Sequence, residues 1–515
     1  MTKVEPSKVV KVAPDVVSVR LRKPIRPGEL RFKDTDQPAK NNVARFPLVS
    51  RILHARATQF LLILPNQIIF WMVIFLGFLG VVDPQVNFAT AITWYLWFCL
   101  VFVMMAVIGR AWCSMCPFGG FAEWIQRRTF FKRTQKALGL GVKLPESWAQ
   151  WGFLLSVGTF LLLTFIEEFF NIAGPGTPHY TSLMVLGIVV TAVTFFLVFE
   201  RRTFCRYICP LSALIGSVGS MGTVAGFRTN DREVCQACTT KDCMRGGSSG
   251  YGCPWYTWPG SAETNSACGL CTECYKGCPS GNVGLYVQKP LTSIIAPHRR
   301  RADLAWSVAL LWGLVFFQQV NATTQYAALD NYLNRVTGWP NYPNPIDYMG
   351  LILAITFITV GIIELYRRAF MVKEMGITQP GNFIEKVTPF RQVFLPMSYA
   401  MIPVVGMDYF ARQLPKFFQH VPALIPAIVE IFGVNAKNWS LVHYHLLSVQ
   451  GIINVQDGVM GIGMLASVFA MAKIFDREIA PLVRNRAAAK MTAIGLMVGL
   501  AVLSGWLYVI MQAAN

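Results

Sequence analysis

The chain has 515 residues, of which 54% are hydrophobic and 14% are charged, and its mean hydropathy is +0.43. Soluble domains carry about 25% charged residues. This composition therefore excludes a soluble enzyme, a disordered tail protein and a small disulfide scaffold. The formal net charge is +19. Because the positive charge lies in loops between apolar runs, we attribute it to membrane topology and expect no nucleic-acid partner.

The N-terminal residues 1–57 are basic and contain no early apolar stretch. A cleavable signal peptide would need such a stretch. We therefore expect a basic cytoplasmic N-terminal segment, with insertion directed by the first spanning helix.

Long apolar runs recur through most of the chain, and about 20 apolar residues cross a bilayer as a helix. The predicted spans are 59–82, 89–109, 150–170, 181–199, 303–320, 346–364, 391–408, 457–475 and 490–511. Cytoplasmic loops are rich in Lys and Arg, and the basic loops fall on one side when nine spans alternate. The sequence therefore predicts a multi-pass protein of a bacterial inner (cytoplasmic) membrane, with a cytoplasmic N-terminus and a periplasmic C-terminus. The apolar segment 421–435 is too short to span, so we expect it to be interfacial or re-entrant.

An internal repeat follows the second and the fourth predicted spans. Residues 110–118 read RAWCSMCPF, and residues 202–211 read RTFCRYICPL. Both cysteine spacings place two thiols on one face of a helix. We therefore expect residues 58–226 to form a duplicated four-helix membrane unit, whose inner boundary carries Cys113, Cys116, Cys205 and Cys209.

The most specific motif is the run 268–279, which reads CGLCTECYKGCP. This is the C-x2-C-x2-C-x3-C-P spacing of bacterial ferredoxins, in which three thiolates hold one cluster and the fourth ligates a second. Zinc also favours four thiolates but usually uses paired C-x2-C knuckles. The run therefore predicts iron–sulfur chemistry.

A second cysteine run at 235–253 has the same character but a stretched spacing, with four glycines between its third and fourth cysteines. Crossed ligation then predicts two [4Fe–4S] clusters. One cluster would be held by Cys235, Cys238, Cys243 and Cys278, and the other by Cys268, Cys271, Cys274 and Cys253. The stretched spacing makes Cys243 the least secure of these ligands.

The membrane-end cysteine pairs leave several interpretations open. They can share a third [4Fe–4S] cluster or another metal, act as redox-active thiols, or be buried packing residues. Twelve clustered cysteines would fill three four-thiolate sites and leave only Cys99. We expect Cys99, which lies within a span, to be a small core residue.

Two hairpins that end in CxxCP and CxxxCP, followed by a two-cluster ferredoxin segment, resemble the membrane-bound 4Fe-4S polyferredoxin family of NapH-, NosR- and CcoG-like proteins. The resemblance covers about 58–290 and rests on the twelve clustered cysteines. It implies electron transfer between the quinone pool or cytoplasmic donors and a periplasmic acceptor system. The chain departs from the family in lacking room for an N-terminal flavin domain and in continuing with five further spans, so the C-terminal bundle has no assignment.

Histidines and ionisable residues near the predicted spans are further candidates for a functional site. No predicted span contains a histidine and there is no C-x-x-C-H motif, so the chain shows no haem ladder. His443 and His445 are candidates for a metal site or a quinone contact near the outer surface, or else belong to a polar loop. We expect His298 to be a basic anchor at the lipid headgroups. Ionisable residues near span ends are expected at the interface, with proton handling as the alternative; these are Glu167, Glu168, Glu364, Asp408 and Asp457.

The predicted fold is mainly α: a polytopic helical membrane protein with an inserted small α+β ferredoxin-like domain. The expected divisions are 1–57, 58–226, a ferredoxin-like domain at 227–300, and a C-terminal five-helix membrane bundle at 301–515 with an extracytoplasmic segment at 409–456. The predicted function is electron transfer between quinone or cytoplasmic donors and a respiratory or periplasmic partner, either other redox subunits or a periplasmic reductase system. An assembly factor that reduces metal or thiols for another enzyme, or a subunit of a larger membrane oxidoreductase, are the alternatives. No catalytic residue is identified.

Overall fold

The computed structural model describes residues 37–130, 138–172, 178–372 and 388–514. The predictions for residues 1–36 and for the final residue lie outside the described part of the chain. The described residues are mostly helical, with one small antiparallel sheet. The predicted fold class is confirmed to this extent.

Nine helices in the described residues are long and apolar enough to cross a membrane, and each coincides with one predicted span. They are α2 (Ala57–Leu79), the run of α3 (Phe88–Thr90), η4 (Ala91–Trp97) and α4 (Phe98–Ile108), α8 (Gly152–Phe169), α9 (Pro178–Val198), α15 (Ala302–Val320), α17 (Pro345–Phe370), α18 (Pro389–Ala411), α21 (Val449–Ile474) and α22 (Arg486–Ala514). These helices fit a multi-pass membrane protein.

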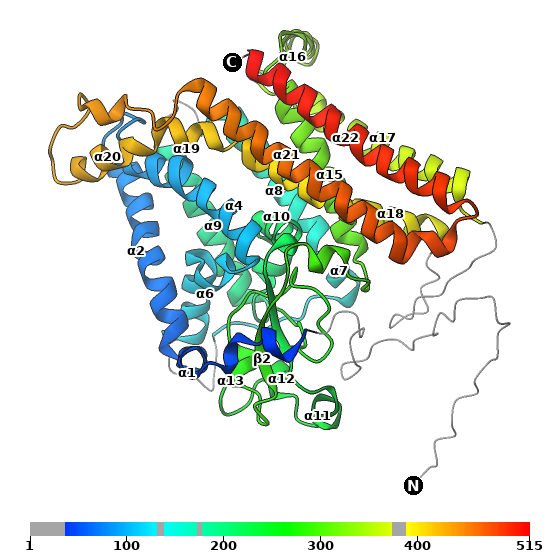
Figure 1. Cartoon of the computed structure of the whole chain (residues 1–515). Coiled ribbons are helices and arrows are strands. Elements are labelled where there is room, and N and C mark those ends of the chain that lie inside the picture. Colours follow the sequence, from blue (N-terminus) through cyan, green and yellow to red (C-terminus); the bar gives the residue numbers. More distant parts are fainter. Residues whose placement is uncertain (1–36, 131–137, 173–177, 373–387, 515) are drawn as a thin grey trace.

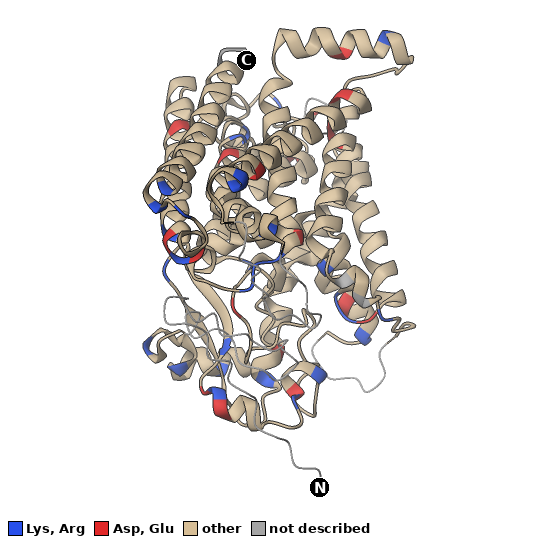
Figure 2. Cartoon of the chain, turned by 90° about the vertical axis from the view of Figure 1, so that its right-hand side faces the viewer, with Lys and Arg blue, Asp and Glu red and all other residues tan. Residues whose placement is uncertain are grey.

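The two ends of the molecule differ in content (Figure 1). Helix α1 (Pro47–His54) and the cysteine-rich domain lie at one end, whereas the C-terminal end of α22 lies at the other, near α16 (Thr324–Thr337). Long stretches of the helical bundle carry no charged residue (Figure 2). Which end faces the cytoplasm stays a prediction.

Short helices join the long ones. Two of them follow the cysteine–proline pairs of the repeat: α6 (Pro117–Arg127) and α10 (Leu211–Val218). The others are η2 (Ala39–Asn41), η3 (Val43–Arg45), α5 (Trp112–Met115), α7 (Glu146–Ala149), η5 (Phe204–Ile208), η6 (Gly219–Met221), α14 (Thr292–Ile295), α19 (Leu414–His420), η7 (Val421–Ala423), α20 (Leu424–Glu430), η8 (Ser440–Val442), η9 (Phe475–Ile479) and η10 (Ala480–Leu482).

The cysteine-rich domain is closed by a two-stranded sheet. Strand β1 (Val224–Thr229) pairs antiparallel with β2 (Val283–Val287), and Phe227 faces Leu285 across the pair. Three short helices lie between the strands: α11 (Arg232–Ala237), α12 (Asp242–Arg245) and α13 (Glu273–Lys276). The sheet therefore brings together the start and the end of the segment that carries eight cysteines.

The C-terminal bundle has a buried polar centre. Asp408 on α18 is 2% exposed, and both of its carboxylate oxygens accept hydrogen bonds from Gln319 Nε2, at 2.9 and 2.8 Å. Ser504 Oγ also donates to this carboxylate. The expectation that Asp408 lies at the interface is therefore wrong, because α15 and α22 pack over it. Such a carboxylate needs these donors to offset its desolvation.

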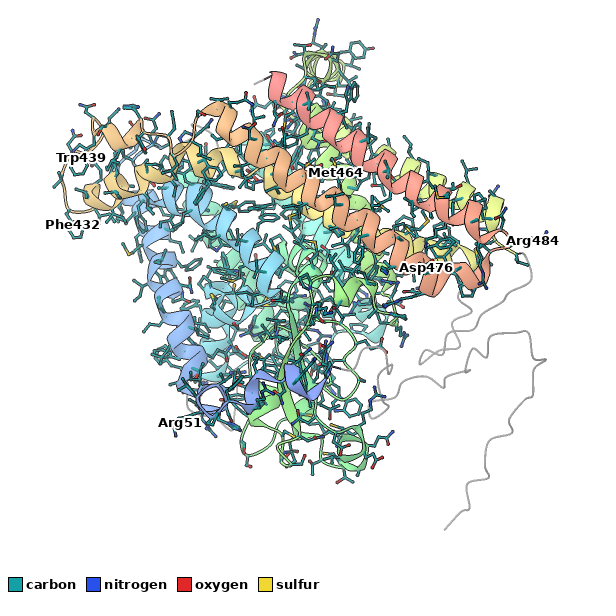
Figure 3. All side chains as sticks on the ribbon, in the orientation of Figure 1. Arg51, Phe432, Trp439, Met464, Asp476 and Arg484 are labelled. Carbon is teal, nitrogen blue, oxygen red and sulfur yellow. The ribbon has the colours of Figure 1, made fainter. Side chains whose placement is uncertain are left out.

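The segment after α18 continues as short helices toward the top of α2 (Figure 1). At its far end Phe432 and Trp439 point away from the bundle, with 79% and 38% of their surface exposed (Figure 3). The prediction of an interfacial or re-entrant segment at 421–435 stays a prediction.

Candidate functional site

The two cysteine runs of the cysteine-rich domain have matching backbone conformations. Lys241 and Thr272 are both left-handed, with φ of 51° and 64°, and each directly precedes a four-residue helix. Cys243 and Cys274 are the second residues of these two helices, α12 and α13. Cys243 is therefore the structural equivalent of Cys274, although the first run is stretched.

The domain holds cysteines of both runs close enough to influence one another's protonation, and the crossed sets stay a prediction. Burial, with the nearby thiols of Cys278, Cys235, Cys238 and Cys253, raises the pKa of Cys243 to about 12. Burial, with the thiols of Cys253, Cys271, Cys268 and Cys243, raises the pKa of Cys274 well above its usual value. Burial and neighbouring thiols disfavour the charged form of a thiol, and a bound metal or cluster would favour it.

Polar groups of the domain point at the cysteine sulfurs. Asn282 donates from Nδ2 to Cys235 Sγ at 3.4 Å and from its backbone N–H to Cys278 Sγ at 3.3 Å. The backbone N–H of Thr257 donates to Cys253 Sγ at 3.4 Å. Hydrogen bonds to ligand sulfurs help to set the potential of an iron–sulfur cluster. The surroundings of these cysteines therefore suit cluster thiolates.

Glycine is required beside one of these sulfurs. Gly226 has φ of +88°, and a Cβ at this position would lie 2.9 Å from Cys268 Sγ. The strand thus approaches the cysteine more closely than any residue with a side chain would allow.

The internal repeat is confirmed in the backbone of the membrane-end cysteines. Cys116 has φ, ψ of −65°, 124° and Cys209 has −54°, 119°, and a proline follows each at the start of a helix. The second pair has one extra residue in its spacing. A single π-helical turn absorbs it, with the Cys209 N–H bonded to Phe204 O at 2.8 Å.

The structure brings the two membrane-end pairs together from the two halves of the repeat. Burial, with the thiols of Cys116 and Cys113, raises the pKa of Cys209 to about 12. The pKa of Cys205 rises well above its usual value through burial, and the Cys209, Cys116 and Cys113 thiols raise it too, against Arg202. Four thiols from two hairpins thus form one set. Cys99 stays apart and is buried within α4, as predicted.

The membrane-end cysteines lie against the cysteine-rich domain. Cys205 lies in the same group of buried, packed side chains as Cys253, Cys271 and Trp255. The indole of Trp255 also lies between the guanidinium groups of Arg110 and Arg202, which are 4.4 and 6.0 Å from its ring centre. Each arginine is the first residue of one copy of the repeated motif. Trp255 of the cysteine-rich domain therefore lies where the two copies meet.

Both arginines are almost fully buried and fix the cysteine segments. Arg202 Nη1 donates to Cys113 O at 2.8 Å, and its Nη2 lies 2.6 Å from Glu123 Oε2. Arg110 donates to Ser212 Oγ and to Ser266 O, each at 2.6 Å. Although burial alone would raise it, Arg127 and Arg202 hold the pKa of Glu123 below its usual value.

The repeated arginine was visible in the sequence, but its role was not. Arg202 faces Glu123, Arg127 and Trp255 only because α6 and the cysteine-rich domain fold over it. No spacing rule connects these positions.

A partly open cavity of about 150 Å³ adjoins the membrane-end cysteines. All four of these cysteines line it, together with aromatic residues of the spans and, at another part of its wall, Glu167. Glu167 lies 4.0 Å from Lys416 Nζ. Four thiolates are the number of ligands that a [4Fe–4S] cluster takes.

Other predicted site residues lie elsewhere. His443 and His445 are both exposed, and His445 Nδ1 is 2.9 Å from Gln419 O. Among the described residues, no three His, Cys, Asp or Glu side chains form a group that could hold a single metal ion. A metal at the two histidines stays a prediction.

His298 is not the headgroup anchor that its basic neighbours indicated. It is 6% exposed, its Nδ1 lies 2.7 Å from Ala296 O, and burial, with the neighbouring Arg300, lowers its pKa to about 3. The side chain is therefore a neutral, buried imidazole.

A comparison with known proteins bears on the repeat. A family model described as a 4Fe-4S binding domain matches residues 90–137 and 181–222, and these two matches contain the two membrane-end cysteine pairs. No curated protein and no solved structure matches the chain. The match supports an iron–sulfur protein with at least one [4Fe–4S] cluster.

Proposed function

We propose that the chain is a membrane-bound electron-transfer protein of the polyferredoxin type with three [4Fe–4S] sites. The thiol sets of the cysteine-rich domain would hold two clusters, and the membrane-end set would hold a third. The observation that carries this proposal is the packing of Cys205, Cys253 and Cys271 around Trp255. One cysteine of the membrane-end set and two cysteines of the cysteine-rich domain thus lie in the same group of buried, packed side chains.

Buried side chains link these sites to one another. Arg110 and Arg202 tie both halves of the repeat to the cysteine-rich domain, and Trp255 fills the space between them. A [4Fe–4S] cluster, when bound, supplies one-electron redox chemistry whose potential depends on burial and hydrogen bonds to sulfur. We infer that electrons pass between a donor on the side of the cysteine-rich domain and a quinone or a partner subunit in the membrane.

The family match at the repeat favours cluster binding by the membrane-end cysteines over free thiol chemistry. The maturation-factor alternative depends on those cysteines being free thiols, so we rank it second. The donor, the respiratory or periplasmic partner system and the inner-membrane location remain part of this proposal.

Proteoliposomes test the proposal. The anaerobically purified protein should exchange electrons between a membrane quinol and a soluble acceptor of one-electron type. The variant that combines Cys113→Ser with Cys205→Ser should keep the EPR signals of the cysteine-rich domain but lose this exchange. Cys99→Ser is the matched control and should behave like the native protein. Full exchange in the double variant would contradict the proposal.

A further inference from the structure

Two buried carboxylates meet where α16 leads into α17, at the end of the molecule opposite the cysteine-rich domain (Figure 1). Asp330 lies on α16 and is 3% exposed, whereas Asp347 lies in the first turn of α17 and is 6% exposed. Tyr326 lies one turn before Asp330 and is also buried. Burial, and then the charge of Asp347, raises the pKa of Tyr326 well above its ordinary value, and Asp330 adds to this effect. The hydroxyl and the two carboxylates therefore lie next to one another.

Asp330 is held in place by neutral donors. Its Oδ1 accepts a hydrogen bond from the backbone N–H of Asn344 at 2.7 Å, and its Oδ2 accepts one from Asn334 Nδ2 at 2.9 Å. Asn344 Nδ2 donates in turn to Asn334 Oδ1 at 2.8 Å and to Thr337 Oγ1 at 2.9 Å. This network fixes Asp330 beside the start of α17 but supplies no positive charge.

Asp347 lacks comparable donors. Within the described residues, neither of its carboxylate oxygens has a hydrogen-bond partner of ordinary geometry, and the same holds for the Tyr326 hydroxyl. In that part of the chain neither Asp330 nor Asp347 forms an ion pair with Lys or Arg. The N-terminal end of α17 offers about half an elementary charge, whereas two ionised carboxylates carry two. The pair therefore needs a proton or a cation to be buried.

The arrangement of oxygen atoms favours a cation over a shared proton. A proton between the two carboxyl groups would serve one oxygen of Asp347 and leave the other without a partner, which is costly for a buried group. A cation in bidentate contact would serve both oxygens. Ca²⁺ takes bidentate carboxylates together with neutral oxygens and water, in a flexible geometry. Mg²⁺ needs near-ideal octahedral geometry and keeps several waters, so it suits this buried pair less well.

We propose that Asp330 and Asp347 form a Ca²⁺-binding site that joins α16 to α17. Asp347 supplies both carboxylate oxygens, and Asp330 supplies the second carboxylate. The remaining ligands are neutral oxygens and water, because only two carboxylates take part. The site is separate from the cysteine sets and does not depend on electron transfer. Its role is to hold α16 against the end of the helical bundle.

Dialysis against radioactive Ca²⁺ measures binding to the anaerobically purified holoprotein in phosphatidylcholine nanodiscs, after bound metal has been removed with EGTA. The native protein should bind one Ca²⁺ per chain with a dissociation constant at or below about 1 mM. Asp347→Asn should weaken binding at least about tenfold, because the charge of the ligands sets calcium affinity. Asp457→Asn is the matched control, since Asp457 is an exposed carboxylate on α21, and it should bind like the native protein.

Hydrogen exchange of α16 is the second measurement. At a Ca²⁺ concentration about ten times the dissociation constant, exchange in α16 that requires release of the ion should slow about tenfold in the native protein. The same concentration should leave exchange in Asp347→Asn unchanged. Iron content and EPR signals are recorded for each variant to show that the rest of the protein is intact.

Three results would overturn the inference. Absence of Ca²⁺ binding, with exchange in native α16 that does not respond to Ca²⁺, would leave a shared proton between the carboxyl groups. Equal binding by the native protein, Asp347→Asn and Asp330→Asn would place the ion elsewhere. Displacement of Ca²⁺ by Mg²⁺ at equal concentration would contradict a calcium site. The response of native α16 decides alone if neither variant folds.

Discussion

Replacement of Glu123 by Gln tests whether a buried ion pair holds the membrane-end cysteine segment. Glu123 lies 2.6 Å from Arg202 and 2.5 Å from Arg127, and the side chains of Arg202 and Glu123 are 1% and 6% exposed. Removal of one partner of such a pair costs about 3–5 kcal/mol, because the other charge stays buried without compensation. Because Arg202 also donates to Cys113 O, the loss should reach the cysteine segment.

Native-state hydrogen exchange of α6 is the assay. At about 1.4 kcal/mol per factor of ten, the variant should speed local opening by between two and four orders of magnitude. Asp476→Asn is the control, because its pair with Lys490 at 2.7 Å is half exposed and contributes less than about 1 kcal/mol. Equal exchange rates in α6 for both variants would refute the reasoning.

The pH dependence follows from the same pair. The folded-state pKa of Glu123 is held below its usual value. Its contribution is therefore complete above about pH 4.5 and is lost as the pH falls through the folded-state pKa. Acid should thus open α6 in the native protein and have a smaller effect in Glu123→Gln.

Three further predictions concern single residues. Cys243→Ser should lower the iron content by about four atoms per chain and leave the EPR signals of the other sites intact, because crossed ligation assigns Cys243 to one cluster only. Unchanged iron would remove Cys243 from the ligands. His298→Asn should reduce the loss of folding free energy in acid. Because the folded-state pKa of His298 is lowered to about 3, the native protein loses up to about 1.4 kcal/mol per pH unit as the pH falls below 6.5. Thermal unfolding between pH 7 and 5 would record this difference. Trp255→Ala should lower the free energy of unfolding of the cysteine-rich domain by about 3–5 kcal/mol and increase limited proteolysis at 222–291. Trp439 is exposed, so Trp439→Ala should do neither.

Much of the architecture follows from local patterns along the chain. In the described part of the chain, nine apolar runs correspond to nine helices, because the length of a span is a local property. The crossed cysteine sets remain a prediction from motif spacing. The placement of Cys99 and of the repeat followed in the same way.

Tertiary packing decided what the sequence pattern could not. Asp408 was expected at an interface, yet Gln319 and Ser504 from two other helices bury it. His298 stands beside three arginines in the sequence, but the fold covers it. No sequence pattern indicated a role for Trp255, because its contacts with two arginines depend on how the cysteine-rich domain packs against the membrane unit.

Iron and acid-labile sulfide counts on the anaerobically purified protein test the central claim most directly. Three four-thiolate sites predict about twelve iron and twelve sulfide per chain. The variant with Cys113→Ser and Cys205→Ser should then contain about eight of each. A native protein with about eight iron, unchanged in that variant, would contradict a cluster at the membrane end.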